Sequence, residues 1–493
     1  MGWDTAIDIG SRGVVRTQWN EGFTSADQYE TVAARSGRRV EQRMNNIMSK
    51  FTRRQFAQLA PGPFLLSLAT RGSAAPPPPA APGAIPTRIV LTWAGDPART
   101  QAVTWRTETA TASPQAQVAK FIADPKFEPS AITVRATFEK DDLGDGKSAA
   151  HYAARFQGLE PATAYCYRVG DAQVWSEWNV FRTASTRPEP FRFLYVGDEQ
   201  NSIKSLWSRS IRLAYAAAPD ARFLVHAGDL VADGYDDRLW GEWSDALAFI
   251  SATLPSIPVP GNHDLHRPPG SPDAKTSLAA AWPWRRHFVL PSNGPDLDDM
   301  PGQSYYLDYQ GVRFIALDVN AFSEEGYEVA ARKRVTEKEL DWLTKVLSDN
   351  PNRWTIVVQH QGIYAISSGR EYAAMRASLA PLYEKHHVDM VLQGHDHVYA
   401  RTHKIARDRI VDPSAPGVVY VISVSGPKMY KTQKVNSQYM AKMIEDEQFY
   451  QIIDVSPERL ALTAYSIDGA VADGFELRKN GTSSTYIDHS SGK

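Results

Sequence analysis

The stretch Val388–His397 reads VDMVLQGHDH: a short apolar run, a glycine, and two histidines with an aspartate between them. A short apolar run that ends at a turn residue is typical of a buried strand in an α/β protein. The glycine allows a sharp turn from strand to loop and a close approach of the backbone to an ion. The pattern therefore predicts a functional site at the carboxyl end of this strand.

Four earlier apolar runs end in residues of the same chemical kind. Because the carboxyl ends of strands in an α/β sheet share one edge, we expect these side chains to converge with His395 and His397. Carboxylates, an amide oxygen and imidazoles together suit Zn, Mn or Fe. A single Gly-Asp pair would carry little weight, but the full series in this order favours a metal site over a set of turn residues and core histidines. The runs Phe191–Val196, Phe223–His226, Ser256–Pro260 and Trp354–Gln359 lead to Asp198, Asp229, Asn262 and His360.

The pattern of apolar and polar residues changes near residue 190. Between about 85 and 187, short aromatic and β-branched runs such as Ile89–Trp93 alternate with turn residues, which predicts an all-β sandwich. The segment Leu159–Tyr165 resembles the corner of fibronectin type III domains at which a tyrosine fixes the turn. From 191 to 478, apolar runs alternate with helical spacing, so the fold class is α/β with a sandwich in front of a layered α/β domain.

Residues 1–84 are predicted to contain an upstream extension, an export signal and a linker. Thr52–Phe56 reads TRRQF, a twin-arginine export pattern, and a weakly apolar stretch, small residues and a Pro/Ala tract follow it. The apolar stretch is too short to span a bilayer. We therefore expect a periplasmic or secreted protein. Met48 stands directly before the signal, which predicts that residues 1–47 are an upstream extension or a misassigned start.

The composition narrows the possible partners. The chain has 493 residues, a net charge of -2 and one cysteine, Cys166, so neither an intramolecular disulfide nor a thiolate metal cluster can form. The balanced charge gives no general attraction to nucleic acid or to an anionic membrane. No obligate protein partner is indicated, and affinity for an anionic substrate must come from a local site.

The order and spacing of the six candidate ligands resemble those of the calcineurin-like metallophosphoesterase superfamily. The successive spacings between Asp198, Asp229, Asn262, His360 and His395 are 31, 33, 98 and 35 residues. Within the superfamily, the sandwich in front resembles purple-acid-phosphatase-like proteins. The resemblance implies a four-layer α/β/β/α domain. It also implies that Asp198 and His397 hold one metal, that Asp229 bridges two metals, and that Asn262, His360 and His395 hold the second.

The resemblance further implies a hydrolase of small phosphoesters. A hydroxide on the metals would attack phosphorus directly, and His263 would contact the phosphate and protonate the leaving group. We expect Asp264 to fix the ring tautomer of His263, or alternatively to cap its loop. Two rival functions remain open: a specialised phosphodiesterase, nucleotide or pyrophosphate hydrolase, and a non-catalytic phosphate-binding protein with a weakened first metal site.

Two positions depart from the family pattern. Purple acid phosphatases have an iron-binding tyrosine three residues after the bridging aspartate, where this chain has Ala232. Other members have a histidine two residues after the first aspartate, where this chain has Gln200. Gln200 could bind the first metal, stand behind its ligands or face the substrate. Because the loss of a phenolate charge is balanced when a divalent ion replaces ferric iron, we expect two divalent ions (Mn, Zn or ferrous iron) and no purple colour.

Several further residues are candidates for substrate contact. His266 follows the Asn262 loop, Tyr364 follows His360 by four residues, and Arg401 follows His397 by four residues. Arg401 could equally form a structural salt bridge. His226 is expected to be a core histidine, and the loop Ser425–Lys428 is expected to help close the site.

Overall fold

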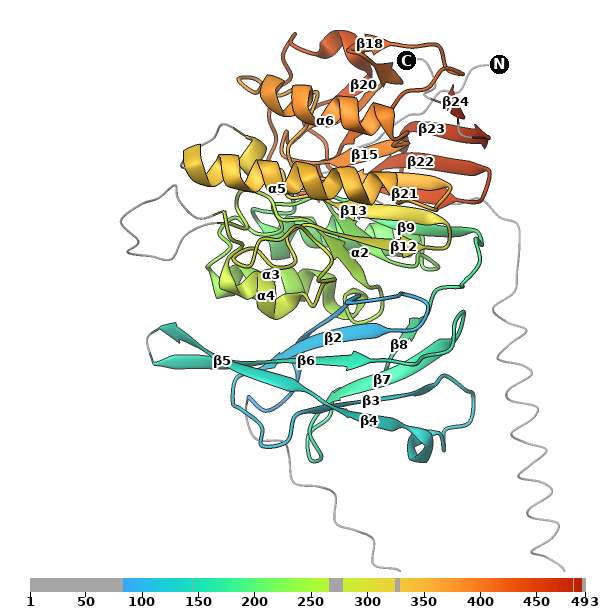
Figure 1. Ribbon diagram of the computed structural model, residues 1–493. Coiled ribbons are helices and arrows are strands. Elements are labelled where there is room, and N and C mark those ends of the chain that lie inside the picture. Colours follow the sequence, from blue (N-terminus) through green and yellow to red (C-terminus); the bar gives the residue numbers. More distant parts are fainter. Residues whose placement is uncertain (1–82, 145, 266–277, 324–328, 482, 490–493) are drawn as a thin grey trace, which may run out of the picture. The chain divides into compact units, whose positions relative to one another are not determined.

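The computed structural model describes residues 83–489, except for residues 145, 266–277, 324–328 and 482 (Figure 1). The predicted export signal within residues 1–82 and the candidate His266 lie outside the described residues. Within the described part of the chain, no helix has the length and apolarity that a membrane span requires.

The first part of the described chain is a β-sandwich, as the sequence predicted. Its sheets have the orders β1-β2-β6-β5 and β4-β3-β7-β8, and all neighbouring strands are antiparallel. Buried aromatic rings, among them Trp105 and Tyr152, fill the core between the sheets. The predicted tyrosine corner is present, because the Glu160 backbone N–H donates to the Tyr165 hydroxyl at 2.8 Å. The strands are β1 (Thr87–Thr92), β2 (Gln101–Thr107), β3 (Gln115–Lys120), β4 (Ile132–Arg135), β5 (Thr137–Gly144), β6 (Lys147–Phe156), β7 (Ala164–Gly170) and β8 (Asn179–Arg182).

Two seven-stranded sheets follow the sandwich. The first has the order β11-β10-β9-β21-β22-β23-β24, and its strands β9 to β11 are parallel. The sheet continues to Asp488, so the predicted domain end at residue 478 falls inside β23. The last strand, β24, was not predicted because its sequence is mostly polar. The strands are β9 (Phe191–Val196), β10 (Leu224–His226), β11 (Ser256–Pro258), β21 (Phe449–Val455), β22 (Arg459–Ser466), β23 (Val471–Asn480) and β24 (Ser483–Asp488).

The second large sheet has the order β12-β13-β14-β15-β19-β16-β20. Its central strands β13, β14, β15 and β19 are parallel, which explains why they are continuous apolar runs. The strands are β12 (Tyr305–Tyr309), β13 (Val312–Ala316), β14 (Trp354–Val358), β15 (Met390–Gln393), β16 (Tyr399–Thr402), β19 (Val419–Ile422) and β20 (Met440–Ile444), with a separate pair β17 (Ile405–Ala406) and β18 (Arg409–Ile410).

Helices cover the outer faces of both sheets (Figure 1). One apolar core, which includes Phe193 and Phe314, lies between the sheets. A second joins the first sheet to α2 and α3, and a third joins the second sheet to α5 and α6. These three cores give the α/β/β/α layers that the resemblance implied. The helices are η2 (Ile203–Trp207), α2 (Ser208–Ala217), α3 (Asp237–Leu247), α4 (Trp282–His287), α5 (Val329–Ser348) and α6 (Ala373–Lys385), with short 3-10 turns at Glu128–Ser130, Ala248–Ile250, Asn320–Phe322 and Ser437–Tyr439.

The candidate ligands come from both large sheets, and not from the single sheet edge that the sequence suggested. Strands β9, β10 and β11 belong to the first sheet, whereas β14 and β15 belong to the second. Tyr195 of β9 links the two sheets at this end: its hydroxyl donates to the Gln393 carbonyl and accepts from the Gln393 N–H at 2.8 Å. The carboxyl ends of strands in both sheets therefore meet at one place.

Buried and half-buried polar contacts join the sandwich to the α/β layers. The Arg88 guanidinium lies 2.6 Å from the Asp237 carboxylate at the start of α3, and the Thr104 hydroxyl donates to the His287 carbonyl at 2.7 Å. His151 of β6 lies beside this contact, with its ring 6.3 Å from that of His287. Burial, which outweighs the adjacent Asp141 carboxylate, lowers the pKa of His151 from 6.5 to about 4.

We expect this histidine to make the fold sensitive to acid. Its pKa is lower in the folded state, so the unfolded chain binds the proton first as the pH falls from 6.5 towards 4, and stability is lost across that window. For His151 alone, the free energy of unfolding should fall by about 2 kcal/mol between pH 7 and pH 5. Denaturant titrations at both pH values test this: His151→Gln should reduce the difference, and an unchanged difference would contradict the assignment.

Candidate metal centre

The candidate ligands lie on tight turns at the ends of their strands. Asp198, Asp229, His395 and His397 have φ values of 52°, 55°, 73° and 51°, a left-handed conformation that non-glycine residues rarely adopt. Such conformations persist where the surrounding structure holds them, often at functional sites. A Cβ atom on Gly394 would lie 2.7 Å from the Asp198 carboxylate, so glycine is required directly before His395.

Two sets of buried donor atoms converge at this point. Asp229, His360 and His395 form one set, and Asp198, Asp229 and His397 form the other, with the donor atoms of each set within 4.8 Å of one another. Asp229 belongs to both sets. This is the division of ligands that the resemblance implied, with the predicted bridging carboxylate in the shared position.

Unpaired buried oxygens at the same point fit bound cations. Both carboxylate oxygens of Asp198, Oδ1 of Asn262 and Oε1 of Gln200 are buried and have no hydrogen-bond partner among the described residues. Buried polar atoms normally have a partner, because an unpaired one loses its hydration without replacement. A metal ion beside each donor set would satisfy these oxygens, so the residues present fit two metals.

Backbone and side-chain partners orient the three histidines. Nδ1 of His360 lies 2.7 Å from the Ala227 carbonyl, and Nδ1 of His397 lies 2.9 Å from the Lys428 carbonyl. These contacts favour a proton on Nδ1 and direct Nε2 toward the donor sets. His395 is reversed, since its Nε2 lies 2.7 Å from the Tyr372 hydroxyl while Nδ1 lies 3.1 Å from Nε2 of His360.

The charged groups of the candidate centre shift one another's pKa values. Burial, together with the neighbouring Asp229, raises the pKa of Asp198 from 3.8 to about 8. Burial opposes protonation of His360, but Asp229 and Asp198 outweigh it and raise its pKa to about 9. A metal ion that binds His360 must therefore displace a proton, so metal affinity should weaken as the pH falls.

Gln200 lies inside the centre. Its Nε2 donates to the Asp229 carboxylate at 2.7 Å and lies 3.3 Å from Nε2 of His397. Rotation of the amide about its last bond would bring Oε1 to the same point. The side chain is therefore within reach of the donor set of Asp198, Asp229 and His397, and direct ligation stays a prediction.

His263 lies at the edge of the centre, but its orienting partner differs from the predicted one. Nδ1 of His263 lies 2.8 Å from the Ala232 carbonyl, and its backbone N–H donates to Asp229 at 2.9 Å. The Asp264 carboxylate instead accepts from the backbone N–H groups of Gly261 and Asp229, at 2.8 and 2.9 Å. The prediction that Asp264 fixes the His263 tautomer is wrong: the loop turns this carboxylate back onto the backbone, which is the alternative capping role.

Two predicted substrate contacts are structural residues. Tyr364 is 1% exposed, packs in the core beneath α5 and α6, and donates its hydroxyl to Asp408 at 2.9 Å. Arg401 is 0% exposed on β16 and holds both oxygens of the Asp473 carboxylate, at 2.6 and 2.8 Å. Both residues lie four positions after a candidate ligand, but nearness in sequence does not determine the direction in which a side chain points. His226 is a buried core residue against Glu199, as expected.

Three residues around the centre belong to no motif that sequence reasoning singled out. Arg370 donates from Nη1 to the His395 carbonyl, Tyr372 contacts the His395 ring, and Tyr430 lies with its ring 4.7 Å from that of His397. Arg370 and Tyr372 follow His360 on the same loop, and that position was the only available signal. The loop Ser425–Lys428 lies against the site, since the Gly426 N–H donates to the Asp198 carbonyl at 3.0 Å.

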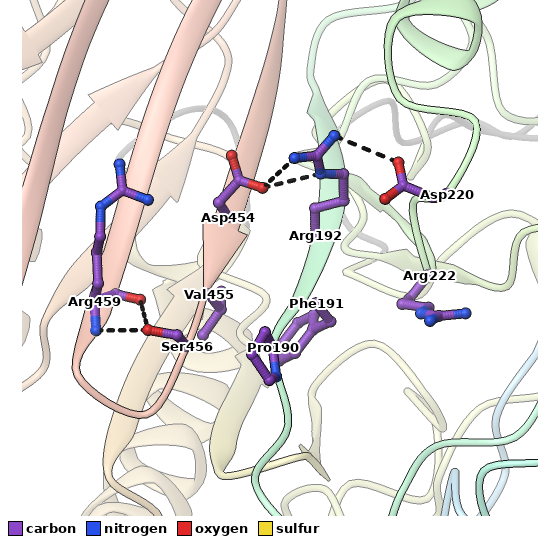
Figure 2. A pocket seen from close by; sticks show the side chains of 9 residues that line it. All are labelled: Pro190, Phe191, Arg192, Asp220, Arg222, Asp454, Val455, Ser456 and Arg459. Atoms are coloured by element: carbon purple, nitrogen blue, oxygen red, sulfur yellow. Dashed lines mark hydrogen bonds and ion pairs between the residues drawn. The ribbon is translucent and has the colours of Figure 1, made fainter.

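A separate cavity lies at the opposite end of β9 (Figure 2). It has a volume of about 390 Å³ and includes Phe191, the first residue of β9, in its lining. Its charged groups largely pair with one another, because the Arg192 guanidinium lies 2.9 Å from Asp454 and 3.4 Å from Asp220. None of the candidate metal ligands lines this cavity.

Sequence comparisons identify both domains. Residues 191–399 match the family described as calcineurin-like phosphoesterase, and residues 86–183 match the purple acid phosphatase N-terminal domain. Purple acid phosphatase 23 of Arabidopsis thaliana is 23% identical over 330 residues, which is 60% of this chain and 66% of that protein. An uncharacterized Mycobacterium tuberculosis protein is 24% identical over 331 residues, 62% of this chain and 59% of its own. These alignments span less than two thirds of either relative.

Solved structures agree on the fold. The purple acid phosphatase PPD1 from yellow lupin seeds has a TM-score of 0.65 at 17% identity, covering 80% of this chain and 75% of that chain. The structure of PhoD has a TM-score of 0.62 at 14% identity, covering 85% and 94%. The chain therefore contains a calcineurin-like metallophosphoesterase domain that follows a purple acid phosphatase N-terminal domain.

Proposed function

We propose that this protein is an exported hydrolase of phosphoric esters that works with two divalent metal ions. The observation that carries the proposal is the sharing of Asp229 by two buried donor sets. A bridging carboxylate is the arrangement by which proteins hold two ions about 3.5–4 Å apart. The names of the matched relatives support the same reaction class, and the twin-arginine pattern at Thr52–Phe56 supports export.

The chain's own residues supply orientation and a proton. Bound divalent ions would provide charge for the phosphoryl oxygens and would activate a water molecule. Because Nδ1 of His263 is held by the Ala232 carbonyl, Nε2 is the nitrogen that would pass a proton to the leaving-group oxygen. The backbone contact between His263 and Asp229 fixes that ring relative to both donor sets. Asp264 stiffens the loop between them through its backbone hydrogen bonds.

The residue at the position of the family's tyrosine supports divalent metals. Ala232 stands at the position of the family's tyrosine and contributes only its carbonyl, and Tyr372 contacts His395 of the other donor set. We therefore propose Mn, Zn or ferrous iron and a colourless protein. An intense visible charge-transfer band in the metal-loaded protein would contradict this assignment.

Elemental analysis combined with a phosphoester panel tests the proposed function. Freshly purified protein, loaded separately with each metal, should bind two ions per chain and hydrolyse p-nitrophenyl phosphate or bis(p-nitrophenyl) phosphate. The ratio of the two rates separates a monoesterase from a diesterase. One ion or none, with no turnover of either ester, would instead support a phosphate-binding protein.

Gln200 should contribute to metal retention. Gln200→Leu keeps the approximate volume but removes both polar atoms, so we expect affinity for one of the two ions to fall by roughly tenfold. Metal titration by calorimetry measures the change. Gln200→Glu restores an oxygen donor and should recover the affinity, and Gln173→Leu on the exposed surface of the sandwich is the control. Equal affinities in wild type and Gln200→Leu would remove Gln200 from the metal site.

A further inference from the structure

Strand β13 ends at the same edge of its sheet as β14 and β15, because the three strands are parallel neighbours. His360 and His395 follow β14 and β15, and both belong to a donor set. Asp318 and Asn320 follow β13, are at most 1% exposed and belong to neither donor set. Two buried polar side chains beside the candidate metal centre therefore have a role that the donor sets do not explain.

The hydrogen bonds of Asp318 hold the turn that carries Asn320. Oδ1 of Asp318 accepts from the backbone N–H and from Nδ2 of Asn320, at 2.9 and 2.8 Å. Its Oδ2 accepts from Nε2 of Gln303 at 2.6 Å. Both carboxylate oxygens thus have protein partners, and the carboxylate fixes the direction of the Asn320 amide.

The Asn320 amide connects the two loops that carry Asn262 and His360. Its Nδ2 also donates to the carbonyl of Pro260, which stands two residues before Asn262, at 3.2 Å. Its Oδ1 accepts from Nε2 of Gln361, the residue directly after His360, at 2.8 Å. The first loop follows β11 of the first sheet, and the second follows β14 of the second sheet. One buried side chain thus links the two sheets between two candidate metal ligands.

Both loops are packed closely against other parts of the centre. A Cβ atom on Gly261 would collide with the Asp229 carboxylate, and the His263 N–H donates to that carboxylate at 2.9 Å. On the other loop, the Gln361 carbonyl accepts from Nε2 of Gln393, at the end of β15, at 3.1 Å. A shift of one loop relative to the other would therefore change the distances between candidate ligands.

We propose that Asn320 is a positioning residue, which sets the separation of Asn262 and His360 and thereby the affinity for the metal ion that they hold. It acts through the Pro260 carbonyl and the Gln361 side chain. This inference rests on the proposed function, because the metal ions are part of that proposal. Apart from the shared carboxylate, the other ion's donor set has no residue in contact with these two loops, so its affinity does not depend on Asn320.

Titration of two single-ion backgrounds with Mn²⁺ tests the inference on the full-length protein. His397→Ala should retain the ion that Asn262 helps to hold, and Asn262→Ala should retain the other ion. In the His397→Ala background, Asn320→Leu should weaken the retained ion by about tenfold or more, measured by calorimetry. In the Asn262→Ala background, it should change the affinity by less than about twofold. Equal losses in both backgrounds, or no loss in the first, would overturn the inference.

A second variant and a control separate positioning from a general loss of stability. Gln361→Met removes the side-chain contact with Asn320 and should weaken the same ion, so the test stands even if Asn320→Leu does not fold. Asn350→Leu is the matched control, because Asn350 donates to Thr355 at 2.8 Å near the start of β14, away from His360. It should leave both affinities within about twofold of wild type. An equal loss of metal affinity in Asn350→Leu, at a similar Tm, would also overturn the inference.

Hydrogen exchange of the metal-free protein separates this inference from the proposed function. The backbone N–H groups of residues 261–264 should exchange about tenfold faster in Asn320→Leu than in wild type, because their loop loses its contact with the second sheet. Asn350→Leu should not change their exchange. Faster exchange in a protein that binds no metal would support the positioning role and contradict the proposed function. Unchanged exchange would overturn the positioning role, even if the protein binds two ions and hydrolyses phosphoesters.

Discussion

Replacement of Asp229 by asparagine should abolish phosphoester hydrolysis and remove bound metal. Asp229 is the one residue shared by the two donor sets, so the loss of its charge weakens both sites at once. Its carboxylate also accepts hydrogen bonds from Gln200 and from the His263 backbone, at 2.7 and 2.9 Å. We expect kcat/KM to fall by roughly 10³-fold or more, and metal content to fall below one ion per chain.

The control must separate a lost metal site from a lost fold. Asparagine has nearly the shape of aspartate, so Asp229→Asn should keep a cooperative thermal transition. Asp245→Asn removes an exposed carboxylate that pairs with Lys204, and it should leave activity and metal content unchanged. If Asp229→Asn retained two ions and substantial turnover, the carboxylate would not bridge two metals, and the assignment of both sites would fail.

The candidate ligands could be predicted because most of them are marked by the residues directly before them. A buried strand, a glycine and a polar residue lie within a few positions of one another, as in Leu392–His395. The glycine has a steric cause, because a Cβ atom at position 394 would collide with Asp198. Constraints of this kind act within short stretches of sequence, and so the convergence of Asp198, Asp229, His360, His395 and His397 and the α/β layers could be predicted.

The errors concern directions and long-range partners. Arg401 pairs with Asp473, 72 residues away, and Tyr364 pairs with Asp408, 44 residues away. Neither partner has a motif that connects it to the site, so closeness to a ligand in sequence was mistaken for closeness in space. The division of the ligands between two sheets depends likewise on tertiary pairing, such as the contact of Tyr195 with Gln393.

The structure also changes the meaning of the missing tyrosine. Sequence comparison with the family pattern treats Ala232 only as the loss of a ligand. In the structure, the Ala232 carbonyl lies 2.8 Å from Nδ1 of the His263 ring. The backbone carbonyl at position 232 therefore orients the proposed proton donor. Any residue that keeps the same backbone conformation can supply this carbonyl. Loss of the phenolate is thus compatible with the proposed role of His263.

His263→Ala should slow turnover while both metal ions remain bound. His263 contributes no side-chain atom to either donor set, and Asp229 would keep its contact with the backbone N–H at position 263. General acid catalysis is worth about 10²–10⁴-fold, so kcat should fall by at least about 10²-fold for an alkyl phosphate. Elemental analysis of the variant should still find the metal content of the wild type.

The leaving group makes this prediction specific. An alkoxide needs a proton as the bond to phosphorus breaks, whereas p-nitrophenolate leaves readily without one. His263→Ala should therefore reduce kcat for an alkyl phosphate at least tenfold more than kcat for p-nitrophenyl phosphate. His489→Ala, an exposed histidine beyond β24, is the control and should change neither rate. Full activity of His263→Ala would exclude this residue from the reaction. Equal losses for the two esters would assign His263 to phosphate binding, because the loss of a proton donor must slow hydrolysis most where the leaving group is most basic.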